Sequence, residues 1–337
     1  MTFSHRIEIA DESQVGEARR YVFELAKSLG CDETFCGQVS IITTELARNI
    51  VRHAGRGEFI TSVIKRADSN EFQFLALDQG AGMRSVVECM RDGFSTAGTA
   101  GTGLGSIQRL SSTFEIHSQA QKGTAVLACL SSAQKSNSHS TPHAAFQVGG
   151  VSVALEGEDL CGDAWTFEET AEGIRVLVCD GLGHGPLAAE ASRECLNVFH
   201  KRVKSSLVEI IEFAHLAATK TRGAAASLAE IIPATKKVNS VAIGNVSMRL
   251  QYPSSSKNLP CLNGTLGASI YKIQPFYNTW EDDTLLIMHS DGLSTQWNLE
   301  DYPGLVRRHP TLIAGVLYRD FRRHRDDATV VVVRHRL

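Results

Sequence analysis

An apolar strand that runs into a glycine-rich turn is the feature that most restricts what this chain can form. Residues 174–179 are apolar apart from one arginine, and Asp180 follows them. Such a run predicts a buried strand that ends at Asp180. Glycines at positions 181, 183 and 185 then permit a sharp turn and can offer carbonyl oxygens to a hard cation. The stretch therefore indicates a metal site, followed by a helix over 187–203.

A single Asp-Gly turn is weak evidence, because aspartate and glycine dominate turns for steric reasons alone. The pattern is repeated, however. A second apolar strand, 285–289, leads to Asp291-Gly292; Asp163 follows a glycine; and Asp326-Asp327 precede the expected strand 328–333. If these ends converge, their oxygen ligands suit Mg²⁺ or Mn²⁺ rather than zinc or copper. Carboxylates so close together need cations to remain ionised.

Four segments carry a family resemblance, in this order along the chain: 157–165, 179–186, 290–294 and 326–330. Together they resemble the motifs of the SpoIIE-type, metal-dependent serine/threonine phosphatases. The stretches 221–226 and 242–246 look like the shorter RsbX-type members, which reset bacterial stress-signalling complexes. The resemblance covers the chain from about Phe146 onward and implies an αββα sandwich.

The resemblance also implies which residues hold two Mn²⁺ or Mg²⁺ ions. Asp180 is expected to bridge both ions and to act as the catalytic metal ligand, Gly181 to give its carbonyl to one ion, and Asp291 and Asp326 to complete the other. Asp163 either ligates directly or holds water on the metal, and both readings stay open. Asp327 replaces Asp326 if the register shifts by one residue. Such ions activate a water molecule and stabilise phosphoryl charge.

One feature of the wider type 2C phosphatases is missing. No arginine stands shortly before Asp163 to orient the substrate phosphate, and the sequence leaves that task unassigned. A basic cluster near the C-terminus indicates a solvated helix face, or an arginine that steers a phosphorylated partner toward the metal site. The cluster consists of Arg307, Arg308, Arg319, Arg322, Arg323 and Arg325.

Composition excludes several classes of protein. The chain has 337 residues, enough for two domains, and a formal net charge of -3, which gives no basic field for nucleic acid or an acidic membrane. No apolar run is long enough to span a bilayer, and the first residues lack a secretory h-region. The eight cysteines show no C-x-x-C spacing. We therefore expect a cytoplasmic protein with reduced cysteines that binds neither nucleic acid nor membrane.

The N-terminal part begins with two expected helices, one from Glu12 or Ser13 to Leu29 and one from Asp32 to about His53. On the second helix Glu45, Asn49 and His53 are each four residues apart, so they form one polar stripe. A polar stripe is ordinarily a solvated helix face. The segments that follow it favour a different interpretation.

Two expected strands, 58–65 and 71–77, follow this helix, and the second leads into Asp78-Gln79-Gly80-Ala81-Gly82. A glycine-rich loop, 98–105, then opens a helix over 106–110. Exposed N–H groups at a helix N-terminus favour anions, so the loop is a good phosphate cradle. Taken alone, three spaced glycines are a weak signal.

In this order, the stripe, the Asp78 motif and the glycine loop resemble the ATP-binding fold of gyrase, histidine kinases and MutL. Residues 44–50 and 92–96 look like the RsbT-type switch kinases, which phosphorylate serine or threonine on small STAS-domain partners. The resemblance runs from about Ile7 to Leu130. It implies an α/β sandwich of the GHKL type that binds ATP.

The resemblance implies a role for each matching residue. Asn49 is expected to bind the Mg²⁺ that accompanies ATP, and Asp78 to read the adenine amino group. Glu45 is the expected catalytic base, because a carboxylate one turn from the metal ligand can accept the proton of an attacking hydroxyl. His53 is interpreted as a structural or helix-terminal residue. The expected ATP-binding residues are Asn49, Asp78, Gly80, Gly82, Gly101, Thr102, Gly103, Leu104 and Gly105.

The remaining pattern completes an α+β chain with three parts: an ATP-binding domain over 1–130, a flexible linker over 131–145 and a phosphatase domain over 146–337. Residues 224–232 are ambiguous between helix and strand, and the family favours a strand. The other expected elements are strands at 115–117, 125–130, 148–155, 239–251 and 268–274 and a helix at 207–218, with a surface loop over 252–263.

Together the two resemblances imply a bifunctional regulator of a bacterial stress or sigma-factor pathway. It is expected to phosphorylate STAS-domain, stressosome-type anti-anti-sigma proteins with ATP and to dephosphorylate them with Mg²⁺ or Mn²⁺. An alternative is a metal-dependent phosphatase with a non-catalytic nucleotide- or partner-binding module. A second alternative is a binding protein in which neither centre turns over; the retained Glu45 and metal-site aspartates argue against it. The oligomeric state stays open.

Overall fold

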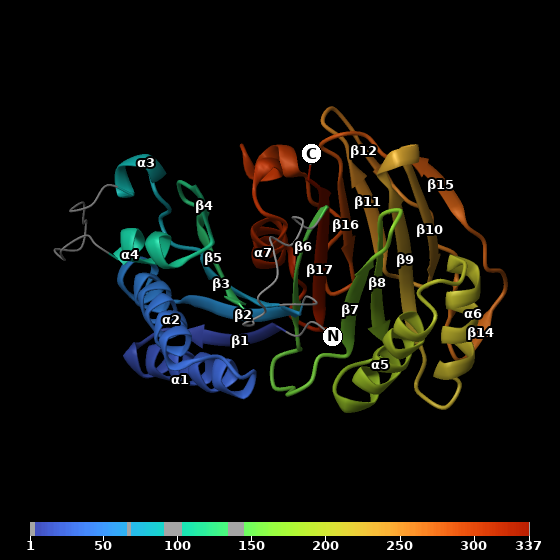
Figure 1. The fold of residues 1–337 in the computed structure, drawn as a ribbon, viewed down its shortest axis with the longest axis horizontal. Coiled ribbons are helices and arrows are strands. Elements are labelled where there is room, and N and C mark those ends of the chain that lie inside the picture. Colours follow the sequence, from blue (N-terminus) through green and yellow to red (C-terminus); the bar gives the residue numbers. More distant parts are fainter. Residues whose placement is uncertain (1–3, 66–68, 91–102, 134–144, 337) are drawn as a thin grey trace. The chain divides into compact units, whose positions relative to one another are not determined.

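The computed structural model describes residues 4–65, 69–90, 103–133 and 145–336. The chain forms two compact units (Figure 1). The N-terminal unit combines Ser4–His139 with Asn298–Arg319, and the C-terminal unit combines Ser140–Trp297 with Asp320–Leu337.

The N-terminal unit is built on one five-stranded antiparallel sheet with the order β1-β2-β3-β5-β4. Two long helices, α1 and α2, cover one face of this sheet (Figure 1). Both helices begin where the sequence predicts, because Asp11 and Asp32 cap their first backbone N–H groups. The elements are β1 Ser4–Ile9, α1 Glu12–Ser28, α2 Glu33–Ala54, β2 Gly57–Lys65, β3 Ser69–Asp78, α3 Val86–Cys89, α4 Gly103–Leu110, β4 Thr113–Gln119 and β5 Gly123–Ala133.

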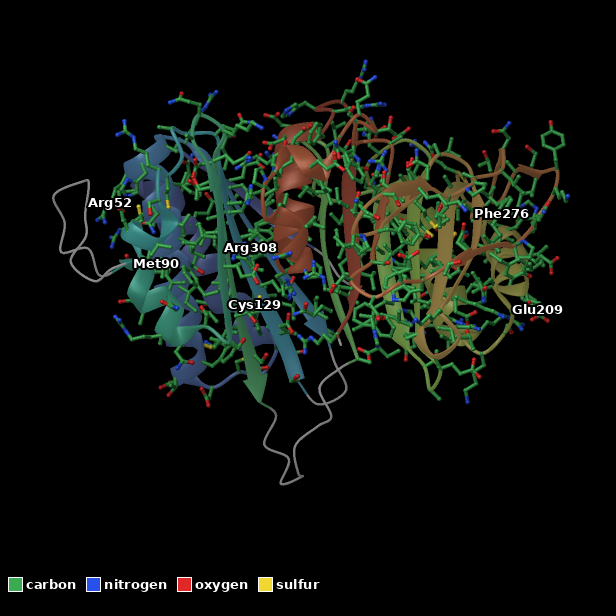
Figure 2. The ribbon with its side chains drawn as sticks, turned by 90° about the horizontal axis from the view of Figure 1, so that it is seen from above. Arg52, Met90, Cys129, Glu209, Phe276 and Arg308 are labelled. Carbon is green, nitrogen blue, oxygen red and sulfur yellow. The ribbon has the colours of Figure 1, made fainter. Side chains whose placement is uncertain are left out.

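The core of this unit lies between the helices and the sheet. On β3 the side chains alternate, so Phe72 and Phe74 join the core with Ile42 and Leu46 of α2. Figure 2 shows how the side chains fill the unit, with Cys129 on β5. All eight cysteines are free thiols, as the lack of paired spacing predicts.

The opposite face of β3 holds the segment Asn298–Arg319, which includes most of α7 (Pro310–Phe321). Thr311 Oγ1 donates to Gln73 Oε1 over 2.8 Å, and both side chains are buried. A side chain at Gly315 would overlap Leu75, so the helix approaches the sheet closely. Two short 3-10 turns precede α7 and belong to the same unit, Leu299–Asp301 and Leu305–Arg307.

The boundaries expected from the sequence therefore need two changes. Residues 298–319 pack with the N-terminal unit, although 146–337 was expected to be one domain. The expected linker began at Ser131, but β5 continues to Ala133. The rest of that linker, up to residue 144, lies outside the described residues.

The C-terminal unit contains two five-stranded sheets. The first has the order β15-β10-β9-β8-β7 and carries α5 and α6 on its outer face (Figure 1). The second has the order β12-β11-β16-β17-β6. The elements are β6 Phe146–Val153, β7 Asp163–Glu169, β8 Ile174–Gly181, α5 Pro186–Lys201, α6 Leu207–Ala218, β9 Ala224–Ile232, β10 Lys237–Ile243, β11 Ser247–Gln251, β12 Ser256–Asn258, β13 Gly264–Thr265, β14 Ser269–Ile270, β15 Phe276–Thr279, β16 Leu285–His289 and β17 Ala328–His335.

Apolar side chains hold these layers together. Leu177 and Cys179 of β8 pack under α5 and α6 with Phe199. The two sheets meet closely where a side chain at Gly150 of β6 would lie 2.9 Å from the ring of the buried Trp165 on β7. The α+β class is confirmed in both units, and the ambiguous stretch 224–232 is the strand β9.

Two expected strands of this unit were wrong in extent. The strand expected over 239–251 is two strands, β10 and β11, which belong to different sheets. The chain turns between them at Gly244, whose φ of 99° is favourable only for glycine. The strand expected over 268–274 is reduced to β14, and the loop expected over 252–263 contains β12. Among the described helices, none has the length and apolar character needed to cross a bilayer.

Candidate functional site

Five aspartates meet at one end of the strands of the C-terminal unit. Asp163 begins β7 and Asp180 lies near the end of the antiparallel β8, where the two residues are direct partners. Asp291 follows β16, and Asp326 and Asp327 precede β17 in the second sheet. In the sequence this convergence was a condition for a metal site, and the family resemblance implied it.

A buried serine joins the two sheets at this point. Ser290 Oγ donates to Asp163 Oδ2 over 2.6 Å, and Thr329 N donates to Ser290 Oγ over 3.0 Å. Asp163 and Ser290 are both buried. Since a serine hydroxyl donates one hydrogen bond, this contact fixes the direction in which the Asp163 carboxylate points.

The aspartates disfavour one another's ionised form. Burial, followed by the charges of Asp291, Asp326 and Asp327, raises the pKa of Asp180 to about 7. Burial and the Asp180 charge also raise the pKa of Asp163 well above its ordinary value. A group of acidic side chains with these properties fits hard divalent cations, which supply the missing positive charge.

The two neighbouring aspartates before β17 have different surroundings. Asp327 accepts backbone N–H groups at both oxygens, from Leu155 at Oδ1 and from Gly162 at Oδ2, each over 2.7 Å. Within the described residues the Asp326 carboxylate accepts a single hydrogen bond, from the N–H of Asp327 over 2.9 Å. This difference favours Asp326 over Asp327 as a metal ligand.

The glycines after Asp180 are needed for two reasons. A side chain at Gly181 would overlap the backbone of Ala188 in the first turn of α5. Gly183 and Gly185 have φ values of 82° and 75°, which other residues rarely adopt. The turn therefore places α5 directly behind the aspartates.

Two polar contacts at this site had no role in the interpretation of the sequence. Asn245 Nδ2 donates to Asp291 Oδ2 over 2.6 Å, from the turn that joins β10 to β11. His184 Nδ1 lies 2.6 Å from Glu158 Oε1. Both pairs lie within the family motifs, but sequence spacing alone gave no sign that their members meet.

In the N-terminal unit the polar stripe of α2 lies next to the glycine loop, whose first described residue is Gly103. A side chain at Gly103 would lie 2.7 Å from Glu45 Oε2, so the start of α4 lies beside this carboxylate. Leu104 and Gly105 follow in α4, half-buried and buried. Gly101, Thr102 and the motif at 92–96 lie outside the described residues.

Asp78 is held rigidly at the end of β3. Its Oδ1 accepts the backbone N–H groups of Gly80, over 2.9 Å, and Thr124, over 3.1 Å. Arg319 of α7 donates to the Asp78 carbonyl over 3.1 Å. Burial raises the pKa of Asp78, while these hydrogen bonds and the charges of Arg319 and His53 oppose the rise.

The two glycines of the Asp78 motif allow close approaches within the unit. A side chain at Gly80 would lie 2.9 Å from the Ala54 side chain at the end of α2. Gly82 has a φ of 69°, and a side chain there would overlap the Gln119 carbonyl. The first contact connects the Asp78 loop to the end of α2, and the second connects it to the end of β4.

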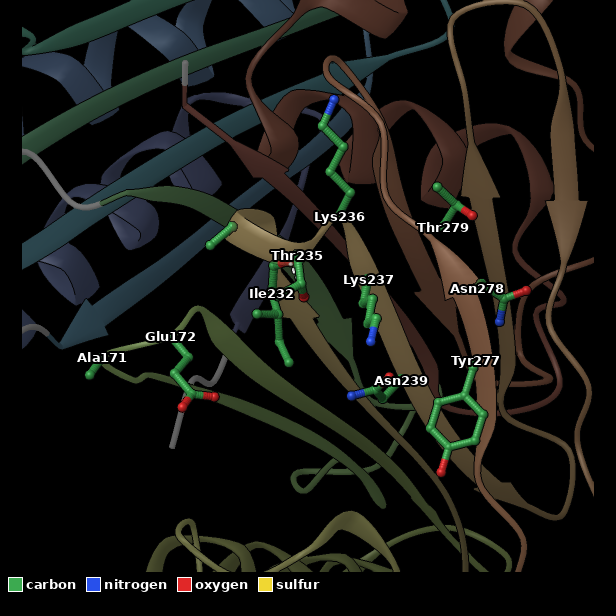
Figure 3. Close-up of a pocket in the computed structure, with 11 residues that line it drawn as sticks. Ala171, Glu172, Ile232, Thr235, Lys236, Lys237, Asn239, Tyr277, Asn278 and Thr279 are labelled. Carbon is green, nitrogen blue, oxygen red and sulfur yellow. Dashed lines mark hydrogen bonds between the residues drawn. The ribbon is translucent and has the colours of Figure 1, made fainter.

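A separate hollow lies on the C-terminal unit, with a volume of about 1010 Å³ (Figure 3). Lys236, Lys237, Asn239 and Tyr277 are among its lining residues. It lies at the far end of β9 from the aspartates, because β9 begins beside Gly181 and ends at Ile232. The hollow is therefore no part of the aspartate site.

Comparison with known proteins identifies a family for each part of the chain. Residues 9–130 match the histidine kinase-like ATPase domain, and residues 170–336 match the stage II sporulation protein E (SpoIIE) family. The serine/threonine-protein kinase RsbT of Bacillus subtilis is 33% identical over 122 residues, which cover 36% of this chain and 92% of RsbT. The phosphoserine phosphatase RsbX of the same organism is 30% identical over 140 residues, which cover 41% of this chain and 70% of RsbX.

A solved chain from the bacterial stressosome, described as a modular system adapted to control secondary messenger signalling, is similar in structure. It has 26% identity and a TM-score of 0.53, and the match covers 56% of this chain and 99% of the other.

The fold and the sites define a protein that joins an ATP-binding domain to a metal-dependent phosphatase domain. The chain belongs to the RsbT family of histidine kinase-like ATPases in its N-terminal part and to the RsbX group of SpoIIE-type phosphatases in its C-terminal part. Its two domains, one kinase-like and one a phosphatase, are those of a partner-switching regulator.

Proposed function

We propose that the chain both phosphorylates and dephosphorylates serine or threonine in STAS-domain proteins of the stressosome type. The observation that carries this proposal is that one chain holds a candidate general base in one unit and a cluster of candidate metal ligands in the other. Glu45 of α2 lies beside the start of α4 in one unit, and five aspartates converge in the other. The names of RsbT and RsbX support opposite activities for the two units.

In the phosphatase unit, Asp180, Gly181, Asp291, Asp326 and Asp163 would hold two Mg²⁺ or Mn²⁺ ions. Such ions activate water for attack on phosphorus and neutralise phosphoryl charge. Asn245 occupies Oδ2 of Asp291 and leaves Oδ1 available. Ser290 likewise occupies Oδ2 of Asp163. Both contacts orient carboxylates before a cation binds, which reduces the reorganisation that binding requires.

In the kinase unit, the two bonds to Asp78 Oδ1 leave Oδ2 to accept the adenine amino group. Asn49 lies one turn along α2 from Glu45 and would ligate the Mg²⁺ that accompanies ATP. Glu45 would take the proton from the attacking hydroxyl of the partner, because it lies beside the start of the phosphate-binding helix.

The decisive test measures both activities on the same partner. Purified chain is incubated with radiolabelled ATP and the STAS-domain proteins of its own organism, and then with Mn²⁺ or Mg²⁺ in excess. We expect label to enter a STAS-domain protein and to be released in a step that depends on Asp180. If no STAS-domain protein acquires label, the kinase part of the proposal is contradicted.

The second candidate is a phosphatase whose N-terminal unit binds nucleotide without transferring phosphate. The support of Asp78 by Gly80 and Thr124 favours nucleotide binding whether or not Glu45 is active. ATP binding together with release of phosphate from a pre-phosphorylated partner, but no labelling, would select this candidate.

A further inference from the structure

The loop between α6 and β9 is held in a fixed conformation. The Ala218 carbonyl accepts both the N–H and the hydroxyl of Thr221, over 2.9 and 2.8 Å. Thr221 Oγ1 then accepts the N–H of Gly223 over 3.1 Å. Arg222 stands between these two anchored residues, so its backbone position is defined by the loop rather than by contacts of its side chain.

This loop is also joined to the turn that follows Asp180. Leu182 N donates to the Gly223 carbonyl over 2.9 Å. A side chain at Gly183 would lie 3.0 Å from Nη1 of Arg222, so the guanidinium rests against the glycine that stands three residues after Asp180. Gly183 thus leaves room for an arginine beside the aspartate site.

The Arg222 side chain is exposed. Within the described part of the chain its guanidinium has no hydrogen-bond or ion-pair partner. The charges that act most strongly on Asp180 are those of Asp291, Asp326 and Asp327, and no arginine is among them. Arg222 therefore lies beside the turn that follows Asp180, is not among the charges that act most strongly on this carboxylate, and keeps its donors available.

We propose that Arg222 binds the phosphoryl group of the substrate and orients it toward the aspartate site, which is the task left unassigned by the sequence. A guanidinium presents paired N–H donors that match two phosphoryl oxygens, and its positive charge opposes the repulsion between a phosphate monoester and the aspartates. This inference rests on the proposed phosphatase function of the same site.

The first test is steady-state hydrolysis of para-nitrophenyl phosphate with saturating Mn²⁺. Because a charge-assisted pair is lost, we expect Arg222→Ala to raise KM by about 10–100-fold with a smaller change in kcat. Arg222→Lys should recover part of this loss, since it keeps the charge but not the paired donors. Lys220→Ala removes a charge from the same loop and should leave KM unchanged.

The small substrate separates two roles. If Arg222 docked a protein partner instead, Arg222→Ala would weaken hydrolysis of a phosphoprotein and leave para-nitrophenyl phosphate unaffected, which would overturn the proposal. Arg325→Ala serves as a comparison, because Arg325 immediately precedes Asp326. A KM increase in Arg325→Ala without one in Arg222→Ala would also overturn it.

The second test does not depend on turnover. Phenylglyoxal modifies exposed arginines, and mass spectrometry of the peptide that contains Arg222 measures the extent of modification. We expect inorganic phosphate to protect Arg222 in the presence of Mn²⁺, while Arg193 on α5 remains equally reactive. Equal labelling of Arg222 with and without phosphate contradicts the assignment.

The outcome for wild type distinguishes this inference from the proposed function. If wild type with Mn²⁺ or Mg²⁺ hydrolyses neither para-nitrophenyl phosphate nor any phosphoprotein, the phosphatase function itself is wrong. If wild type is active and Arg222→Ala has the same KM, only the role of Arg222 is wrong.

Discussion

Asp163 and Asp180 are direct partners across the antiparallel pair β7–β8, so their side chains project from the same face of one sheet. Two carboxylates in such positions repel each other. Burial adds to this effect, and the pKa values of both groups are raised. The unit therefore maintains an unfavourable arrangement of charge that a divalent cation would relieve.

This arrangement predicts how the stability of the metal-free protein depends on pH. The pKa of Asp180 is about 7 in the folded state, against an ordinary value of 3.8. Between these values the folded state binds more protons than the unfolded state, so stability is greatest below the ordinary pKa and is lost as pH rises through about 7. Bound cations require the ionised carboxylate and reverse this loss.

We therefore expect the increase in Tm on adding Mg²⁺ or Mn²⁺ to be larger at about pH 8 than at about pH 6. Thermal unfolding with and without the ion, in buffers that do not chelate, measures the difference. Asp180→Asn serves as the control, since it removes the titrating group. An increase of the same size at both pH values would count against the repulsion described above.

Asp180→Asn should reduce phosphatase activity by about 10²–10³-fold, because one ligand shared by two ions is lost. The measurement is hydrolysis of a phosphoprotein with saturating Mn²⁺. Asp159→Asn is the matched control, because this exposed acid lies in the neighbouring loop. Wild-type rates for Asp180→Asn would show that the metal site is wrongly placed.

Asp78→Asn should weaken ATP binding by about 10–100-fold, since an amide accepts a hydrogen bond from the adenine amino group less strongly than a carboxylate. Isothermal calorimetry with ATP and Mg²⁺ measures the effect. Asp32→Asn makes the same exchange at the cap of α2, where asparagine caps as well as aspartate, and should bind ATP normally. Equal affinities for Asp78→Asn and wild type would remove the adenine-reading role.

Glu45→Ala and Asp180→Asn should have opposite effects on a phosphorylated partner. Loss of a general base slows transfer by about 10²–10⁴-fold, so Glu45→Ala should bind ATP but leave the partner unphosphorylated. Asp180→Asn should let the phosphorylated partner accumulate. Phosphopeptide mass spectrometry after incubation with ATP, Mg²⁺ and Mn²⁺ compares them. If Asp180→Asn gave no more phosphorylated partner than Glu45→Ala, the N-terminal unit would be a binding module.

Gly315→Val should destabilise the N-terminal unit by about 1–3 kcal/mol, because a side chain there would overlap Leu75 on β3. Urea unfolding monitored by the loss of ATP binding reports on the stability of this unit. Gly304→Ala, at an exposed glycine of the same segment, tests a backbone effect without overlap, since no atom lies near its missing side chain. A smaller loss for Gly315→Val than for Gly304→Ala would contradict the packing described for α7.

Local patterns were sufficient to predict the elements that carry both sites. The capped helices α1 and α2 and the apolar strands β8 and β16 follow from periodicity and from single residues at their ends. In these elements the deciding interactions lie within a few residues of one another in sequence. The convergence of the aspartates joins distant residues, and only the family resemblance implied it.

Features that depend on distant residues were not predictable in this way. The break at Gly244 depends on its contact with the loop at Leu262, and the site of Arg222 depends on a hydrogen bond between Leu182 and Gly223. Likewise, nothing in the apolar pattern of α7 indicated which sheet it joins. The preference for Asp326 over Asp327 required the backbone partners of each carboxylate.

The packing of residues 298–319 on β3 has a consequence for synthesis of the protein. Gln73 is separated from its partner Thr311 by 238 residues. At about 5–20 residues per second, the ribosome needs about 10–50 s to make that interval. During this time β3 has emerged without its covering helix, while nearly all of the phosphatase unit is translated. The N-terminal unit is therefore completed only near the end of synthesis. A truncated product that ends before Pro310 contains neither a finished ATP-binding unit nor Asp326.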